Sequence, residues 1–340
     1  MIFSAEKWDN GAEIKSYVNV SAALSFKKME NPLNNAFTFF LKPVIGDELS
    51  ERLINIYNVL PTKDQIAITG SVDAETKLDI EFLKLCQYAV SNLAFWYDFD
   101  AINLRITDAG FQRQSSENNS FSPAYKYQED SLRRQFKNKG FNMLDKVIDF
   151  LYDNLDNFIE FKKSVTYNSD LSSIVKSTDD VNKVYYINYS RLVYLRLQAP
   201  IKFATEMHLK NDIGDKLYEQ LIKWLEEGRD KEDNDIEKLR WYSARYVIAL
   251  AVKRLLTDTG SITDRGLYFD TIQPGKNGNT TMEPVGMDRL AVTIQNLECD
   301  ARMYKDALIK YIRDKYPDYF VGNPSNALIR DNDDKRTFWV

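Results

Sequence analysis

The chain has 340 residues, 44% of them hydrophobic and 28% charged, so it can bury a sizeable core as one large domain or two ordinary ones. Fifty acidic residues against 45 basic ones give a formal net charge of −5, which argues against a general nucleic-acid binder. A single histidine, His208, and two cysteines without a CxxC pair, Cys86 and Cys299, argue against zinc sites, disulfide frameworks and Ser-His-Asp catalysis. We therefore expect no enzyme, cofactor or metal.

No stretch approaches the roughly 20 consecutive apolar residues of a membrane helix. Residues 1–15 mix acidic and basic side chains where a secretory signal needs an apolar run. We expect a protein that is made in the cytoplasm and does not enter a membrane. Its 20 tyrosines, 19 phenylalanines and 5 tryptophans suit extensive packing and subunit contacts.

An internal repeat organises the predicted elements. Residues 44–57, VIGDELSERLINIY, resemble residues 212–225, DIGDKLYEQLIKWL, 168 positions later. Pro32 stands opposite Pro200 at the same offset, and the pattern Ile-Thr-Asp-x-Gly at residues 106–110 recurs at 262–266. Several similarities in one order predict a tandem duplication.

The first predicted elements of each half are two short helices. Pro32 and Pro200 are placed to begin a helix, and Asp47 and Asp215, each after a glycine, are candidate N-caps of the next helix. A long helix follows in each half, because apolar residues recur at helical spacing from Leu78 to Trp96 and from Leu239 to Leu255.

The period then changes at the Ile-Thr-Asp-x-Gly pattern. Leu104, Ile106 and Phe111 around the first turn, and Ile262, Leu267 and Phe269 around the second, predict short strands on either side of a tight turn. Two further helices are expected in each half, at residues 123–139 and 142–157, then at 285–299 and 301–315.

The predicted fold is mainly α, with two tandem duplicated helical bundles that each carry a small β-hairpin. The first helical repeat covers residues 1–165 and the second covers 183–320. A Ser/Thr/Asp-rich stretch at 164–180 joins them, and an extended C-terminal arm covers 321–340.

The turn residues are the first interaction candidates. They are Thr107, Asp108 and Gly110 in the first half and Thr263, Asp264 and Gly266 in the second. The two aspartates resemble a catalytic carboxylate pair, but Thr, Asp and Gly are also what a tight turn requires, and this second interpretation is favoured. An exposed turn is compatible with a contact role.

The C-terminal arm is polar and rich in turn residues, yet it ends in Phe338-Trp339-Val340. One interpretation is a disordered end. The other is an arm whose aromatic tip binds a pocket of a neighbouring protein, since tryptophan is a frequent anchor and such segments order on binding.

Three stretches resemble a family of virion proteins from tailed phages and prophages of gut bacteria, which are similar to head-tail connectors, or adaptors. They are WDNGAEIKSYVNVSAALSFKKMENPLNNAFTFFLKPVIGDEL, SNLAFWYDFDAINLRITDAGFQR and SPAYKYQEDSLRRQFKNKGFNMLDKVIDFL, and the resemblance covers nearly the whole chain. The family's motifs are structural, and the duplication departs from its simpler single-bundle adaptors.

The resemblance implies a structural virion protein that forms a ring with itself in the phage neck, between the portal protein and a tail or stopper protein. DNA would pass through the ring without specific binding, and a mildly acidic chain suits a lumen along which DNA slides. The alternative is a cytosolic helical scaffold that binds another protein. An enzyme such as a phage hydrolase comes third, because the single histidine and the lack of ligand clusters weigh against it.

Overall fold

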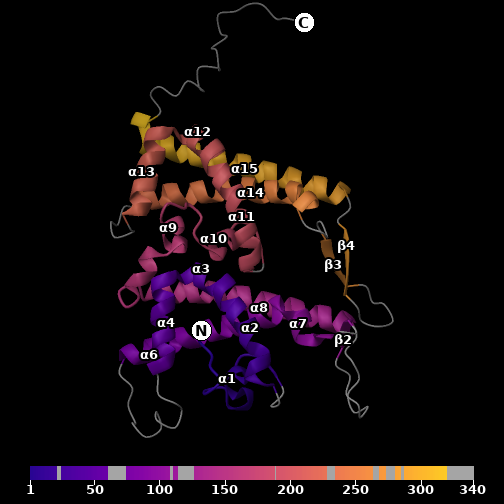
Figure 1. Ribbon diagram of the computed structural model, residues 1–340. Helices are drawn as coiled ribbons and strands as arrows, with labels where there is room; N and C mark the ends of the chain where they lie inside the picture. Colours follow the sequence, from indigo (N-terminus) through magenta and orange to yellow (C-terminus); the bar gives the residue numbers. More distant parts are fainter. Residues whose placement is uncertain are drawn as a thin grey trace, which may run out of the picture. The chain divides into compact units, whose positions relative to one another are not determined.

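The computed structural model is mainly helical, as the periodicity predicts (Figure 1). It describes residues 1–20, 24–59, 74–107, 110–113, 126–187, 189–227, 234–262, 268–272, 280–284 and 287–319. The chain divides into two compact units. Unit 1 comprises Met1–Asp170 with Ile187–Leu195, and unit 2 comprises Leu171–Tyr186 with Arg196–Val340. The stretch expected to link the halves is therefore built into the units.

Unit 1 begins with short helical elements. They are η1 (Asp9–Gly11), α1 (Ala12–Lys15), α2 (Phe26–Ala36), the π-helical turn η2 (Phe37–Leu41), α3 (Lys42–Ile45) and α4 (Asp47–Val59). Pro32 lies inside α2, not in its first turn as expected. Gly46 separates α3 from α4 with a φ of 86°, a backbone conformation that residues other than glycine rarely adopt. Asp47 is the first residue of α4 rather than its cap, so its carboxylate lies near the positive end of the helix.

Two long antiparallel helices form the centre of unit 1. They are α6 (Ala74–Tyr97) and α8 (Lys126–Asp153), which pack side by side (Figure 1). The prediction of two helices at residues 123–139 and 142–157 was wrong. A single helix, α8, covers this stretch and continues through Gly140. A Cβ added at Gly140 would lie 2.6 Å from Leu93 Cγ, so this glycine permits a close approach to α6. The remaining elements are α7 (Phe99–Asn103), η3 (Ile159–Lys163) and α9 (Val165–Leu171).

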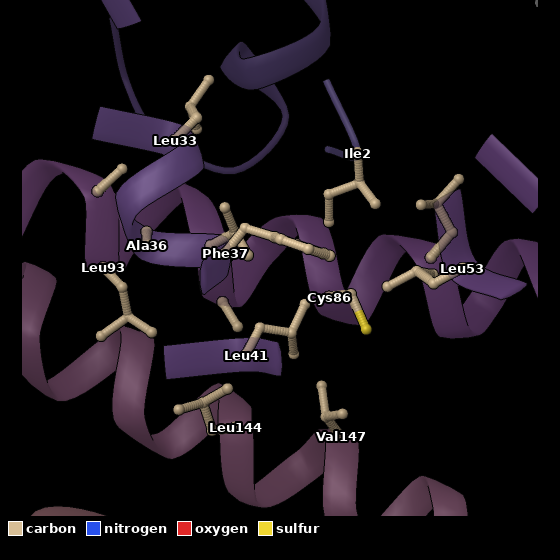
Figure 2. Close-up of a cluster of buried hydrophobic side chains, with 14 of the residues drawn as sticks. Ile2, Leu33, Ala36, Phe37, Leu41, Leu53, Cys86, Leu93, Leu144 and Val147 are labelled. Carbon is tan, nitrogen blue, oxygen red and sulfur yellow. The ribbon is translucent and has the colours of Figure 1, made fainter. Parts of the chain in front are cut away.

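The core of unit 1 fills the space between these helices and the N-terminal residues. Figure 2 shows Ile2, Leu41, Cys86 and Val147 converging from separate segments, and all four side chains are fully buried. A buried aliphatic side chain contributes about 1.5–3 kcal/mol. Burial also raises the pKa of the Cys86 thiol, so Cys86 serves packing rather than thiolate chemistry.

Unit 2 presents a comparable series of helices. They are α10 (Thr178–Asn182), α11 (Arg191–Ala204), the π-helical turn η4 (Thr205–Leu209), α12 (Lys210–Ile213), α13 (Asp215–Glu226), α14 (Asn234–Ile262), α15 (Met287–Lys315) and η5 (Pro317–Tyr319). The first residues of α11 belong to unit 1 and the rest to unit 2. Pro200 lies inside α11, not in its first turn, and Asp215 is the first residue of α13 rather than its cap. Both predictions were therefore wrong in the same way as those for Pro32 and Asp47. The single helix α15 replaces the two that were predicted.

Two short antiparallel strand pairs accompany the helices. β1 (Leu104–Thr107) pairs with β2 (Gly110–Arg113), which follows it closely in the sequence, as the first Ile-Thr-Asp-x-Gly pattern predicts. β3 (Tyr268–Ile272) pairs with β4 (Thr280–Pro284). The second hairpin was therefore predicted in the wrong place: Ile262 is the last residue of α14, and the paired strands are joined by residues 273–279. The helical pattern of α14 extends into the segment where a strand was expected.

Candidate interaction surfaces

The residues predicted as contact sites are only partly described by the structure. Thr107 is the last residue of β1 and Gly110 the first of β2, and they are partners in the strand pairing. The others lie outside the described residues: Asp108, Thr263, Asp264, Gly266, Phe338, Trp339 and Val340.

An aromatic cluster at the π-helical turn of unit 1 forms an exposed surface, here called ledge 1. It consists of Phe39 and Phe40 from η2 with Trp96 and Tyr97 from the end of α6. Phe39 is 56% exposed and Tyr97 45% exposed, and their ring centroids are 5.8 Å apart. Phe40 packs on Trp96 at 5.6 Å, and both contact the ring of buried Phe141 beneath. The exposed rings therefore rest on a fixed aromatic base.

The π-helical turn of unit 2 carries a second exposed surface, here called ledge 2. It consists of Phe203, Met207, His208 and Arg254. Met207 is 54% exposed and Phe203 38% exposed. The Arg254 guanidinium carbon lies 3.7 Å from the Phe203 ring centroid, and His208 meets the same ring edge-on at 5.8 Å. Ledge 2 is thus apolar and cationic, held together by a cation–π contact.

Sequence reasoning missed both ledges, although ledge 1 has a readable signal. Adjacent aromatics such as Phe39-Phe40 and Trp96-Tyr97 point about 100° apart on a helix, so one core seldom buries both. His208 was interpreted as a packing or surface residue, and it contacts Phe203 at the surface of unit 2.

A partly buried acid, Glu13, links the N-terminal segment of unit 1 to α6. Glu13 Oε1 accepts a hydrogen bond from Gln87 Nε2 at 3.0 Å, and Gln87 also donates to the backbone oxygen of Ile2 at 2.8 Å. Within the described residues, Glu13 Oε2 is buried without a hydrogen-bond partner. Burial raises the pKa of Glu13 to about 7, although Tyr57, Gln87 and the charge of Lys7 lower it in part.

A hollow of about 580 Å³ lies between α4 and the start of α6. Among its described lining residues Arg52 is the one basic side chain. Its guanidinium donates to the backbone oxygen of Asn157 at 2.6 Å and pairs with Glu160 at 3.1 Å and Asp79 at 3.4 Å. Partners within the chain thus already occupy this cation, so the hollow offers little to an anionic substrate.

Two kinds of site are absent from the described part of the chain. Among those residues, no three side chains of His, Cys, Asp or Glu are grouped as metal ligands would be. None of the described helices combines the length and the apolar character needed to cross a bilayer.

Comparison with known proteins gives one family and no relative of known activity. No curated protein and no solved structure matches the chain. One family model matches residues 41–170 and residues 209–327, which together cover more than half of the chain. The protein therefore belongs to the family of unknown function DUF6712.

Proposed function

We propose that this protein is a structural virion protein that forms a ring in the neck of a tailed phage, between portal and tail, and acts as a conduit for DNA. The observation that carries the proposal is the presence of one exposed apolar ledge at the same π-helical turn of each unit. A chain built from rigid helical hairpins, with a repeated contact surface, suits assembly into a symmetric oligomer. The sequence resemblance to head-tail connectors supplies the setting.

We further propose that the two units arose by tandem duplication. In both units a proline-containing helix runs into a five-residue π-helical turn, then a four-residue helix, then a glycine of positive φ. The φ of Gly46 is 86° and that of Gly214 is 82°. π-Helical turns are rare, so their recurrence 168 residues apart, with the same flanking elements, supports common descent. The two segments matched by the family model also begin 168 residues apart.

The long helical hairpins support the same proposal. The order of buried, half-buried and exposed positions in residues 82–92 of α6 recurs without change in residues 239–249 of α14. The order in residues 136–140 of α8 likewise recurs in residues 297–301 of α15. When residue 82 is aligned with 239 and residue 136 with 297, Trp96 corresponds to Lys253 and Lys137 to Glu298. The cation–π contact of Lys137 with Trp96 in unit 1 thus has its counterpart in the ion pair of Lys253 with Glu298 in unit 2. The same two positions thus interact through different chemistry in each unit.

One set of equivalent positions has changed from apolar to polar. In unit 1, Val44, Ala89 and Leu144 belong to the hydrophobic core or pack against it. The positions that correspond to them in unit 2 hold Asp212, Tyr246 and Lys305, which form one hydrogen-bonded set. Tyr246 Oη donates to Asp212 Oδ2 at 2.8 Å and Lys305 Nζ donates to Asp212 Oδ1 at 2.6 Å. Both solutions satisfy every group that they bury, as two diverged copies of one fold would.

The predicted contact residues fit into this proposal as follows. The segments around Asp108 and Asp264 and the C-terminal arm would contact neighbouring subunits, the portal protein, or the tail or stopper protein. The aromatic tip Phe338-Trp339-Val340 would be the anchor of the arm.

Quantitative mass spectrometry of purified phage particles tests the neck assignment. If the protein forms a ring in the neck, each particle should contain about as many copies of this chain as of the portal protein. Many more copies than portal would indicate a capsid or tail-tube protein. Absence from purified particles would contradict a virion role and favour the cytosolic scaffold.

A further inference from the structure

We propose that copies of this chain associate head to tail, with ledge 1 of one copy against ledge 2 of the next. The inference rests on the proposed ring and identifies the surfaces that would build it. The occupant of each ledge is thus a second copy of the same chain.

The two ledges are exposed to a similar extent at equivalent positions. Phe39 and Met207 stand at the same place in their π-helical turns and are 56% and 54% exposed. Exposed apolar side chains that gather in one patch are typical of protein–protein contact surfaces. Phe40, Trp96 and Phe141 brace ledge 1 from below, so little side-chain entropy would be lost when a partner binds.

The two ledges are also complementary in charge. Tyr97 of ledge 1 corresponds in the helix register to Arg254 of ledge 2. Ledge 1 therefore offers aromatic faces, which carry negative potential, where ledge 2 offers a guanidinium that already stacks on Phe203.

The same chemistry disfavours pairing of ledge 2 with itself. Two copies of ledge 2 placed face to face would bring one Arg254 against the other, and like charges at an interface weaken it. When unlike surfaces pair, a linear assembly of several copies has an unpaired ledge 1 at one end and an unpaired ledge 2 at the other. It therefore propagates until the rotation closes into a ring.

Two surface variants of the full chain test this arrangement. The first variant carries Phe39→Ser with Tyr97→Ser and retains ledge 2. The second carries Met207→Ser with Phe203→Ser and retains ledge 1. Sedimentation velocity over a hundredfold range of concentration should show a closed oligomer for the unaltered chain and a monomer for each variant alone, with association weakened by at least a hundredfold.

Mixing the two variants provides the decisive result. Each has one intact ledge of the opposite kind, so an equimolar mixture should form a 1:1 dimer that grows no further. A dimer of the second variant by itself would mean that ledge 1 pairs with ledge 1, and would overturn the head-to-tail arrangement. A mixture that stays monomeric, or an unaltered chain that is monomeric throughout, would overturn it as well.

Controls separate surface effects from misfolding. Leu132→Ser on α8 and Met303→Ser on α15 remove exposed apolar side chains outside the ledges and should leave the oligomer intact. Circular dichroism should show equal helical content in all variants. If a double variant fails to fold, Arg254→Glu alone replaces it, and should weaken association at least tenfold. A ring in solution with absence from phage particles would contradict only the neck assignment, and monomers in solution with portal-like copy number in particles would contradict only the ledges.

Discussion

Replacement of Glu13 by glutamine should stabilise the protein at neutral pH and remove part of its pH dependence. Burial raises the pKa of Glu13 from 4.5 to about 7. Below pH 4.5 the carboxyl is protonated in both the folded and the unfolded chain, and its contribution to stability is fully present. Between pH 4.5 and 7 the unfolded chain ionises first, so stability is lost as the pH rises.

The size of the effect follows from the same pKa. A shift of this size corresponds to at most about 3.4 kcal/mol, and the partial exposure of Glu13 reduces it to about 2 kcal/mol. The melting temperature of the original protein should therefore fall by about 4–8 °C between pH 4.5 and 8 relative to that of Glu13→Gln. Differential scanning calorimetry of both proteins in parallel measures this difference, and the contributions of other titrating groups cancel.

Unit 2 provides a matched control with the opposite sign. There Asp180 of α10 pairs with buried Arg240 of α14, and Arg240 also donates to the backbone oxygen of Ile174. Because the partner is a cation, Asp180→Asn removes the carboxylate from a largely buried ion pair and should destabilise the protein by about 3–5 kcal/mol. The reasoning is refuted if Glu13→Gln lowers the melting temperature at pH 8, or if its pH profile parallels that of the original protein.

Three further substitutions test packing, polar replacement and the arm. Gly140→Ala should destabilise by about 1–3 kcal/mol, because its Cβ would overlap Leu93; urea unfolding measures this. If the overlap is the cause, Leu93→Ala should cost less in the Gly140→Ala variant than in the original protein. Asp212→Val alone should cost about 2 kcal/mol in thermal unfolding by leaving Tyr246 and Lys305 without their acceptor, and the triple change to Val, Ala and Leu should recover most of it. Alanine at both Phe338 and Trp339 should abolish binding to the portal protein in a pull-down while helical content stays constant; unchanged binding would contradict the arm.

The local pattern of the sequence predicted the helices well where polar and apolar residues alternate at helical spacing. The junctions at Gly46 and Gly214 were readable because Ile-Gly-Asp recurs with the same flanking leucines. The local pattern failed where tertiary contacts determine how far a helix extends. Gly140 reads as a break between helices, yet close packing against Leu93 keeps α8 continuous. Ile262 reads as a strand residue, yet α14 extends to it.

The candidate surfaces were harder to foresee than the fold. Composition indicated aromatic contacts but gave no position for them. Ledge 1 brings together Phe39 and Tyr97, which lie 58 positions apart, and ledge 2 joins Phe203 to Arg254. Such pairs depend on which faces of two helices meet, and one sequence alone does not determine that. The equivalence of Tyr97 and Arg254 became visible only from the burial order of the long helices.

The path of the chain between the units has a consequence for how the protein would respond to proteases. Residues 171–186 belong to unit 2, but the next nine residues belong to unit 1. Within those nine, Arg191 pairs with Asp145 of α8 at 3.0 Å, and both side chains are largely buried. A single cut within residues 171–186 would thus leave the downstream fragment still bound to unit 1 through this segment. The nicked protein should run as two bands in denaturing gels and as one particle in solution.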